Sequence, residues 1–446
     1  MAKRPNFVIF YTDDQGYGDL GCMGASDLKT PNLDALAASG ARFTDWYSNS
    51  PVCSPSRAAL LTGRYPGHAG VRSILAGHRQ ATGLPHTTPT IASALKQEGY
   101  RAYMSGKWHL GVAEDYRPQN RGFDRWLGLL AGCVDYYSHI FYWGGHDPVH
   151  DLFEDNVELW DNGHYVTELI SERAVDYIED AARREDPFFL YVAYNAPHYT
   201  MHAPKEYLDR FPGLPWDRAI MAAMLAAVDD GVGQVMDALE RNGLTENTFV
   251  FFQSDNGPSR ETRNWLDGNT EPYYGGTAGP LKGHKFSLYE GGIRMPCLMS
   301  WPAAIPAGQV ISEPGAAMDL FPTVLSAAGG NPADYELDGL NVLPMVTTGA
   351  KSPHEAIYWE MGDQTALRRG EWKLVLNGQL VEGAPPEDSV HLSNLSDDPG
   401  ERVNLRDRYP DLAAELTQDT EAWRAELENH WRERYANAPA ATAHHE

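Results

Sequence analysis

Two pairs of oxygen-bearing side chains each follow a short apolar run that is typical of a buried strand. They offer only carboxylate and amide oxygens, three of the four side chains being anionic, and this donor set favours a hard divalent cation such as Ca²⁺ or Mg²⁺. A lone Asp after a strand is more often a loop cap than a ligand, so the hypothesis depends on finding two pairs. The pairs are Asp13 with Asp14, after Phe7–Tyr11, and Asp255 with Asn256, after Thr248–Gln253.

Basic and imidazole side chains follow two further strand-like runs. Lys107 and His109 come after Ala102–Met104, and His198 comes after Pro187–Ala193. Beside a metal, such groups would bind an anion and transfer protons. Taken singly, each could equally be a surface or helix-capping residue.

A cysteine precedes a predicted short helix. Ser54 and Pro55 are expected to open this helix and Gly63 to close it, which would place Cys53 at the positive helix end, where backbone N–H groups favour anions. Cysteine phosphatase loops have five residues between Cys and Arg, whereas three separate Cys53 from Arg57. On spacing alone, a buried structural cysteine is an equally good interpretation.

These groups need a scaffold that brings strand ends together. Strand-like runs, including Pro296–Ser300, alternate with helical stretches along most of the chain, which predicts an α/β fold with a large mixed, mostly parallel sheet between helices. In such sheets ligands bind beyond the carboxyl ends of the strands, so the polar clusters are expected to converge there if their strands are parallel neighbours. Helix starts are predicted at Thr30-Pro31 and Thr88-Pro89, and a long helix at Arg218–Arg241.

The pattern changes after about residue 345. Short strand-like pieces broken by turns precede a charged amphipathic helix at Pro410–Arg434, and residues 435–446 resemble a frayed tail. We therefore expect two domains, a catalytic α/β domain of residues 1–345 and a small C-terminal unit, an antiparallel sheet plus helix, of residues 346–446.

Composition excludes several classes of protein. The chain has 36 basic and 61 acidic residues and a net charge of −25, so nucleic acid is not expected as a partner. A membrane span needs about 18 consecutive apolar residues, and from the sequence we expect no such run and no membrane association. The four cysteines form neither a disulfide framework nor a zinc motif. The N-terminal apolar run is shorter than a signal peptide's, from which we expect a cytoplasmic location.

The segment from Cys53 to Arg64, CSPSRAALLTGR, resembles the signature of the type I sulfatases, in which the cysteine is converted to formylglycine. Further stretches agree with that family in the same order, and the likeness covers nearly the whole chain. The resemblance implies an arylsulfatase-like enzyme of the alkaline phosphatase-like superfamily. The agreeing stretches include Asn6–Asp19, Gly106–Gly111, Ala196–His198, Ser254–Gly257, Lys285–Arg294 and Leu395–Glu401.

The resemblance also implies a role for each site residue. The metal, usually Ca²⁺ in this family and with Mg²⁺ possible, would be held by Asp13, Asp14, Asp255, Asn256 and the modified Cys53. One hydroxyl of the hydrated formylglycine would attack sulfur, and the second would later expel sulfate by re-forming the aldehyde. The remaining roles are sulfate binding by Lys107 and Lys285, protonation of the leaving oxygen by His198 with Lys285, proton removal by His109, and orientation of the formylglycine by Arg57.

Lys282 lies three residues before Lys285 and is a second candidate for the site lysine. Lys285 is preferred for that role because its spacing to Tyr289 matches the family. Weaker candidates for the substrate pocket, for which structural packing is the favoured interpretation, are Asp135, Tyr136, His139, His202, Arg72 and His86.

Two alternatives stay open beside a sulfatase that releases inorganic sulfate from a small sulfate ester. One is a phosphonate monoester or phosphodiester hydrolase with the same nucleophile and metal; the other is a non-catalytic anion-binding protein with an intact thiol. A sulfatase would also need a formylglycine-generating enzyme for maturation. The sequence does not determine the ester or the oligomeric state. A divalent cation would leave the predicted site locally positive despite the acidic chain, which suits a small, singly charged ester.

Overall fold

The computed structural model describes residues 4–143, 148–260 and 273–435. An 11-stranded mixed sheet forms its centre, in the order β12-β2-β11-β10-β1-β9-β3-β4-β7-β8, with β13 paired to β2. The five central strands run parallel: β10 (Thr248–Ser254), β1 (Asn6–Thr12), β9 (Phe188–Ala193), β3 (Arg101–Lys107) and β4 (Arg125–Leu129). The sequence predicted the first four of these strands but not β4.

Antiparallel strands flank this parallel centre on both sides. β11 (Arg294–Ser300) pairs antiparallel with β10 and β2 (Ala41–Tyr47), and β7 (Phe153–Glu154) pairs antiparallel with β4. The expected mixed, mostly parallel sheet is confirmed. The other short strands are β5 (Ile140–Phe141), β6 (Val149–His150), β8 (Val157–Glu158), β12 (Gln309–Ile311) and β13 (Gly315–Ala316).

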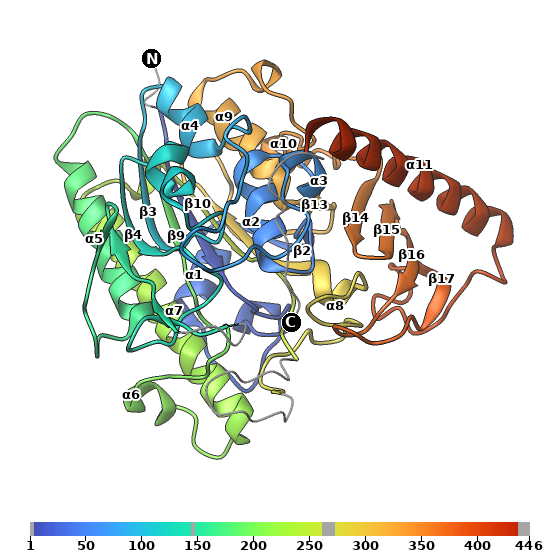
Figure 1. Ribbon diagram of the computed structural model, residues 1–446, viewed down its shortest axis with the longest axis horizontal. Helices are drawn as coiled ribbons and strands as arrows, with labels where there is room; N and C mark the ends of the chain where they lie inside the picture. The colour runs from blue at the N-terminus through green and yellow to red at the C-terminus, as the bar shows by residue number, and fades with distance from the viewer. Residues whose placement is uncertain (1–3, 144–147, 261–272, 436–446) are drawn as a thin grey trace.

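Helices cover both faces of the large sheet (Figure 1). Alternation along β1 separates the two cores, because Phe7 and Ile9 pack on one face whereas Val8 and Phe10 pack on the other. The first core includes α2 (Cys53–Thr62), α4 (Ile91–Gln97), α9 (Leu320–Ala328) and α10 (Leu343–Thr348). The second includes α1 (Pro31–Ala38), α5 (Val166–Ala182) and α7 (Trp216–Arg241). The shorter helices are α3 (Pro66–Ala69), α6 (Lys205–Leu208) and α8 (Glu290–Ile293).

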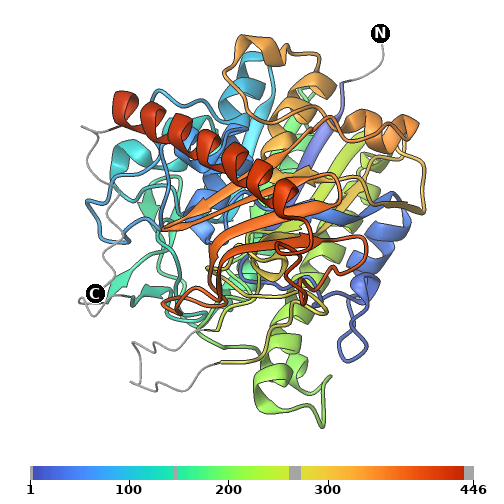
Figure 2. The same ribbon diagram turned by 90° about the vertical axis from the view of Figure 1, so that its right-hand side faces the viewer.

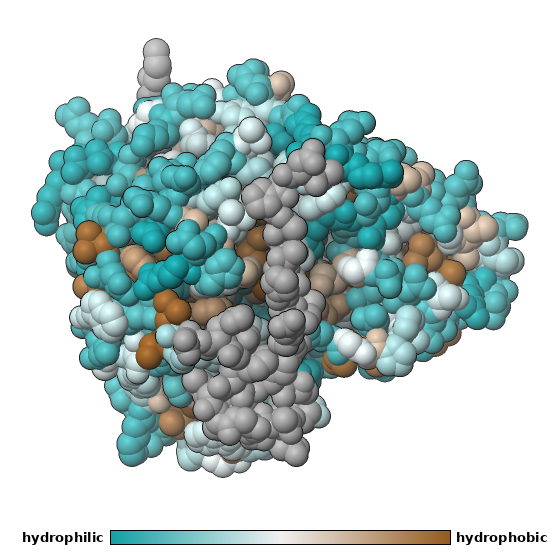
Figure 3. All heavy atoms as spheres, in the orientation of Figure 1, coloured by the Kyte–Doolittle hydropathy of each residue, from teal (hydrophilic) through white to brown (hydrophobic). Residues whose placement is uncertain are grey.

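The long helix α7 corrects one expectation from the sequence. By length and composition alone it could cross a membrane, contrary to the expectation that no such segment exists. However, 78% of its most apolar window is buried inside the fold, as in the core helix of a soluble protein. The view in Figure 3 is correspondingly dominated by hydrophilic residues, with only small, separate hydrophobic areas.

Two predicted helix starts need correction, whereas α1 begins at Pro31 as expected. Helix α4 begins two residues after Pro89, because the Thr90 hydroxyl accepts a hydrogen bond from the backbone N–H of Ser93 and forms a capping box. Helix α2 begins at Cys53 itself, with Val52 rather than Ser54 at the N-cap position.

A small antiparallel sheet and a long helix make up the C-terminal part of the chain. Helix α11 (Pro410–Arg434) lies across the outer face of this sheet (Figure 2). On that face Leu367 and Leu374 pack against α11, whereas Ala366 and Val375 of the same strands belong to the core shared with the large sheet's body. The strands, in order, are β14 (Ile357–Met361), β15 (Gln364–Arg369), β16 (Trp372–Gly378) and β17 (Asp388–Asn394).

A fully buried ion cluster joins β16 to the segment that follows Lys285. The Lys373 ammonium lies 2.7 Å from Glu290 Oε1 and 3.3 Å from Glu401 Oε1, and all three side chains are inaccessible to solvent. The backbone N–H of Glu290 also donates to Glu401 Oε2 at 2.6 Å. Removing the shared ammonium would leave two buried carboxylates without their common partner.

We expect Lys373→Met to lower the free energy of unfolding by about 3–5 kcal/mol, because Glu401 would lose the cation it pairs with in the buried cluster, while Glu290 would keep only its ion pair with Arg294. Urea unfolding followed by circular dichroism measures this loss. The control is Lys351→Met, since Lys351 pairs with Glu313 at the surface and should leave the unfolding midpoint unchanged. Equal midpoints for Lys373→Met and wild type would contradict the expected contribution.

A histidine–aspartate pair connects the chain before β14 to the start of α9. His354 Nε2 lies 2.8 Å from the Asp319 carboxylate, and both side chains are buried. Burial lowers the pKa of His354, but the Asp319 charge and hydrogen bond outweigh this and raise it above its usual value. The ion pair should therefore stabilise the fold fully below the unfolded-state pKa of about 6.5 and lose that contribution as pH rises through the higher folded-state pKa.

Accordingly, the stability difference between wild type and His354→Gln should be largest near pH 6 and shrink towards pH 9. Urea midpoints measured across this range test the expectation. His78 is exposed, so His78→Gln is the control and should show no such trend. A difference for His354→Gln that stays constant with pH would reject the assignment.

Candidate active site

The register of the central strands places the predicted polar clusters at one edge of the sheet. Thr12 of β1 is paired with Ser254 of β10, and Tyr11 with Ala193 of β9, so these strands end at the same level. Gly106 of β3 is also paired with Ala193. The side chains that follow the four strands are thereby brought together, as the sequence predicted from their positions.

The four oxygen-bearing side chains form a buried cluster. The backbone N–H of Asp14 donates to Asp255 Oδ1 at 3.1 Å, and Asn256 Nδ2 donates to Asp14 Oδ1 at 2.7 Å. All four side chains are almost inaccessible to solvent. Asp13 Oδ1 and Asn256 Oδ1 have no hydrogen-bond partner among the described residues.

Three basic side chains face these carboxylates. Lys107 Nζ lies 2.5 Å from Asp13 Oδ2, Arg57 Nη2 lies 2.7 Å from Asp255 Oδ2, and Lys285 Nζ lies 2.9 Å from Asp14. Arg57 is held over the ring of Tyr11 and also donates to the carbonyl of Lys107 at 3.3 Å. The negative and positive side chains of the site therefore balance one another.

Cys53 is the first residue of α2 and is 3% exposed. All ten residues of this helix are buried, and Gly63 ends it with a left-handed φ of 68°. Burial raises the pKa of the Cys53 thiol, whereas Lys107 and Lys285 oppose that rise, so both ammonium groups act on the thiol. Arg57, one turn further along α2, pairs with Asp255 at 2.7 Å, which ties the start of this helix to the carboxylate cluster.

Two histidines complete the arrangement. His198 Nε2 lies 3.7 Å from Asp14 Oδ2, and its Nδ1 contacts the carbonyl oxygen of Tyr199. Burial and the charge of Lys285 lower the pKa of His198 to about 3. His109 Nε2 lies 3.2 Å from the carbonyl oxygen of Leu75, and burial lowers its pKa well below the usual value. Both imidazoles are therefore neutral at pH 7.

The three neighbouring carboxylates do not share their charge equally. Burial and the proximity of Asp13 raise the pKa of Asp255 to about 7. Burial would also raise the pKa of Asp14, but the charge and the hydrogen bond of Lys285 lower it to about 2. An additional positive charge at this point would stabilise the ionised form of all three carboxylates.

Several contacts around the site were not predicted. Asp14 and His109 adopt left-handed backbone conformations, with φ of 63° and 53°, for which the sequence gives no signal. The backbone of Leu75 holds two parts of the site, since its N–H donates to the Ser54 hydroxyl and its carbonyl contacts His109.

Most of the weaker pocket candidates have structural contacts. Tyr136 is buried and donates to the carbonyl of His198 at 2.8 Å, which fixes the segment after β9. Asp135 accepts hydrogen bonds from backbone N–H groups of its own loop, and Arg72 pairs with Glu360 of β14. The other contacts are His139 with the carbonyl of His164, His202 with the ring of Tyr136, His86 with the ring of Tyr116, and Lys282 with Glu387.

The chain is similar to known proteins over most of its length. A sequence model of the Sulfatase family matches residues 5–330. Human N-acetylgalactosamine-6-sulfatase is 35% identical over 90% of this chain and 82% of that protein, and human arylsulfatase A is 34% identical over 91% and 84%. The solved structure of Ps i-CgsB in complex with k-i-k-neocarrahexaose has a TM-score of 0.84 and 32% identity, covering 96% of this chain and 97% of that one.

A phosphonate hydrolase is a more distant neighbour. The structure of the phosphonate monoester hydrolase of Agrobacterium radiobacter has a TM-score of 0.64 and 19% identity, covering 95% of this chain and 96% of that one. This likeness is one of fold alone. Since the family match spans most of the chain and includes Cys53 and the whole carboxylate cluster, this chain belongs to the sulfatase family and is a sulfuric ester hydrolase.

Proposed function

We propose that this sulfatase cleaves a small sulfate monoester with a formylglycine made from Cys53 and a divalent cation held by the neighbouring oxygen cluster. The observation that supports this most is the placement of Cys53 at the start of a buried helix, among Lys107, Lys285 and the carboxylates. A formylglycine hydrate and the cation would together supply an acidified hydroxyl as the nucleophile.

The oxygen cluster fits a hard divalent cation. Its donors are three carboxylates and one amide, without sulfur or nitrogen, which suits Ca²⁺ and admits Mg²⁺. Asp13 Oδ1 and Asn256 Oδ1 are buried, and neither has a hydrogen-bond partner among the described residues. A cation would satisfy both oxygens and compensate the repulsion between Asp13 and Asp255. The residues that would hold it are Asp13, Asp14, Asp255 and Asn256, with the modified side chain of Cys53.

The basic groups would bind and orient the sulfate. Lys107 and Lys285 each contact a different carboxylate of the cluster, Asp13 and Asp14 respectively, and both act electrostatically on Cys53. They can therefore contact the oxygens of a sulfate whose sulfur lies next to residue 53 and stabilise the charge that develops there. Arg57, fixed by Asp255 and the Tyr11 ring, would orient the side chain of residue 53.

Proton transfer is assigned to the two histidines and Lys285. Lys285 lies with His198 at Asp14, so the Lys285 ammonium is placed to donate a proton to the leaving oxygen, and His198 can act as the acid beside it only after its Nε2 has taken up a proton. His109 is neutral, and its Nδ1 has no hydrogen-bond partner among the described residues. This nitrogen can accept the proton removed when sulfate is released.

The substrate class follows from the charge of the site and from its relatives. With a divalent cation the buried site has an excess of positive charge, although the chain as a whole carries −25. A monoanionic ester of a sugar or a phenol suits a site that is positive within an otherwise acidic chain. Both leaving-group types are supported by the names of similar proteins, which are arylsulfatase A, N-acetylgalactosamine-6-sulfatase and a structure in complex with k-i-k-neocarrahexaose.

Two measurements test this proposal. We expect kcat/KM for an aryl sulfate to exceed that for the matching aryl phosphonate, and a preference of several orders of magnitude for the phosphonate would favour the alternative hydrolase. We also expect the tryptic peptide Phe43–Arg57 of active protein, produced together with a formylglycine-generating enzyme, to carry formylglycine. Mass spectrometry showing an intact Cys53 thiol in fully active protein would reject the nucleophile.

A further inference from the structure

A second cluster of metal-binding side chains lies outside the catalytic site, where α11 packs against α3. It consists of His68, Glu426 and His430. We propose that these three side chains bind a divalent transition-metal ion such as Zn²⁺, which links the C-terminal helix to the helix that follows the Cys53 segment. This inference does not depend on the proposed sulfatase mechanism.

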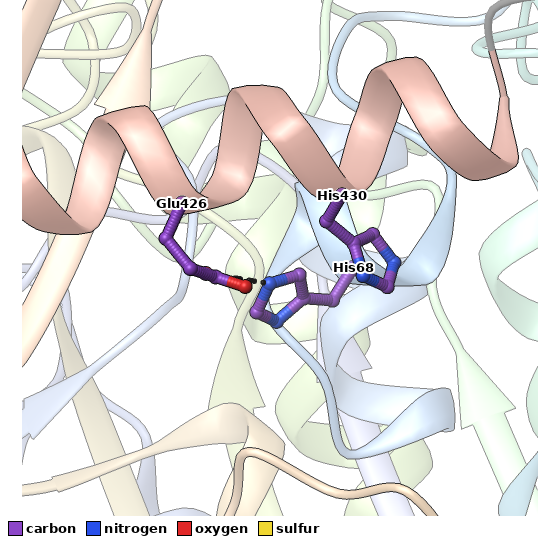
Figure 4. Close-up of side chains that lie close together, drawn as sticks. All are labelled: His68, Glu426 and His430. Atoms are coloured by element: carbon purple, nitrogen blue, oxygen red, sulfur yellow. Dashed lines mark hydrogen bonds and ion pairs between the residues drawn. The ribbon is translucent and has the colours of Figure 1, made fainter.

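The three side chains come from two elements and face one another. Glu426 and His430 are four residues apart on α11 and project from it toward His68, which belongs to α3 (Figure 4). Residues at this spacing lie on one face of a helix. Helix α11 thus supplies two ligands, and α3 supplies one, to the same point.

The distances are close to those of a metal site. One ligand atom of each residue lies within 4.8 Å of the other two, and His68 Nε2 is 3.2 Å from Glu426 Oε2. In a tetrahedral zinc site, with metal–ligand distances of about 2.1 Å, neighbouring ligand atoms are about 3.4 Å apart. The Glu426 side chain is 60% exposed, so it can rotate by the small amount needed.

A further carboxylate orients His68. Asp338 lies 2.9 Å from His68 Nδ1 and also accepts a hydrogen bond from the backbone N–H of Tyr65 at 2.7 Å. Metal-binding histidines usually donate their other ring N–H to such a carboxylate, which fixes the tautomer and directs the free nitrogen to the metal. Here that arrangement directs Nε2 of His68 toward Glu426.

His430 brings a second imidazole to the cluster. One of its ring nitrogens lies within 4.8 Å of a ligand atom of His68 and of Glu426. Two imidazoles and one carboxylate suit zinc better than calcium, in contrast to the oxygen-only cluster of the catalytic site.

The backbone around the cluster is tightly held. A Cβ at Gly67 would lie 2.7 Å from Leu427, so α3 approaches α11 more closely than any other residue type at this position would permit. Leu427 is fully buried, and the Tyr435 hydroxyl donates to the carbonyl of His68 at 2.9 Å. The ligands are therefore positioned before any ion binds, which reduces the entropic cost of binding.

The competing explanation is a proton instead of a metal. A protonated His68 could donate to both Asp338 and Glu426, and this would account for two of the observed contacts. It would not involve His430, the third member of the cluster. Zinc and the proton compete for Nε2 of His68, so metal binding is best measured near pH 8.

The test measures zinc binding by untagged full-length protein in excess Ca²⁺, which occupies the oxygen-only site. His444 and His445 are replaced by Gln in every variant, because they could bind zinc independently. We expect one zinc per chain by equilibrium dialysis and elemental analysis, and a rise in thermal midpoint on adding ZnCl₂. Glu426→Gln and His430→Gln should each weaken zinc binding at least tenfold and abolish that rise, whereas the matched control His78→Gln should change neither.

Two results of the zinc-binding test would contradict the proposal. No zinc bound in excess Ca²⁺, or equal binding by wild type, Glu426→Gln and His430→Gln, would overturn the proposal. Because Glu426 is largely exposed, Glu426→Gln should fold normally even if His430→Gln does not. Aryl sulfatase activity of Glu426→Gln, measured in Ca²⁺ without zinc, should equal that of wild type, so a failure of this metal site is distinguishable from a failure of the catalytic proposal.

Discussion

Cys53→Ala is expected to lower kcat/KM for an aryl sulfate by about 10⁴-fold or more, because a methyl group can be neither oxidised to an aldehyde nor hydrated to a nucleophile. The fold should be retained. Cys53 is the first residue of α2, and the packing of that helix depends on Ala58, Leu60 and Leu61 in the core beneath the sheet. Activity and circular dichroism of the same preparation measure both effects.

The matched control for this substitution is Cys22→Ala, which removes a partly exposed thiol away from the carboxylate cluster. It should retain wild-type kcat/KM. If Cys53→Ala kept activity within about tenfold of wild type, a covalent role for residue 53 would be excluded.

Asp255→Asn is expected to lower both metal affinity and turnover, with kcat/KM falling by about 10⁴-fold, since a charged oxygen donor is lost where a cation would polarise the nucleophile. The substitution preserves shape, and the amide oxygen can still accept the hydrogen bond from Asp14 N. It also removes the charge that pairs with Arg57 at 2.7 Å. Elemental analysis after dialysis against Ca²⁺, together with steady-state kinetics, measures the two effects.

Another buried aspartate provides the control for general effects of charge removal. Asp229 is 1% exposed and accepts hydrogen bonds from the backbone N–H groups of Asn32 and Leu33, where α7 contacts α1. Asp229→Asn should lower stability while keeping metal content and kcat. Wild-type metal content in Asp255→Asn would argue against Asp255 as a ligand.

The elements that carry the site could be predicted because each depends on a local pattern. Apolar runs such as Phe7–Tyr11 predicted strands, and helical spacing predicted α7 and α11 almost to their ends. The predicted helix starts were in error where local hydrogen bonds determine the first helical residue. The Thr90–Ser93 capping box shifted one start by two residues, and it became evident only from backbone geometry.

The charge pairing inside the site could not be predicted, because it joins residues far apart in the sequence. Arg57 and Asp255 are 198 residues apart, and Lys285 and Asp14 are 271 apart. Which cation faces which carboxylate depends on the strand order, and several orders are compatible with the same strands. From the sequence, these residues could be grouped only by chemical type. The register of β1 with β9 and β10 determines which of them become partners.

By itself, the sequence determined the chemistry that is available: oxygen donors after two strands, a cysteine beside a predicted helix start, and basic and imidazole groups at the other strand ends. Tertiary structure decided how those groups act on one another, because burial and long-range pairing are properties of the assembled sheet. It alone placed a charged network around Cys53, gave Asp14 and His109 their left-handed backbone conformations, and brought His68 between two residues of the last helix. Local patterns specify elements and their ends, whereas the contacts between distant ends exist only once the chain has folded.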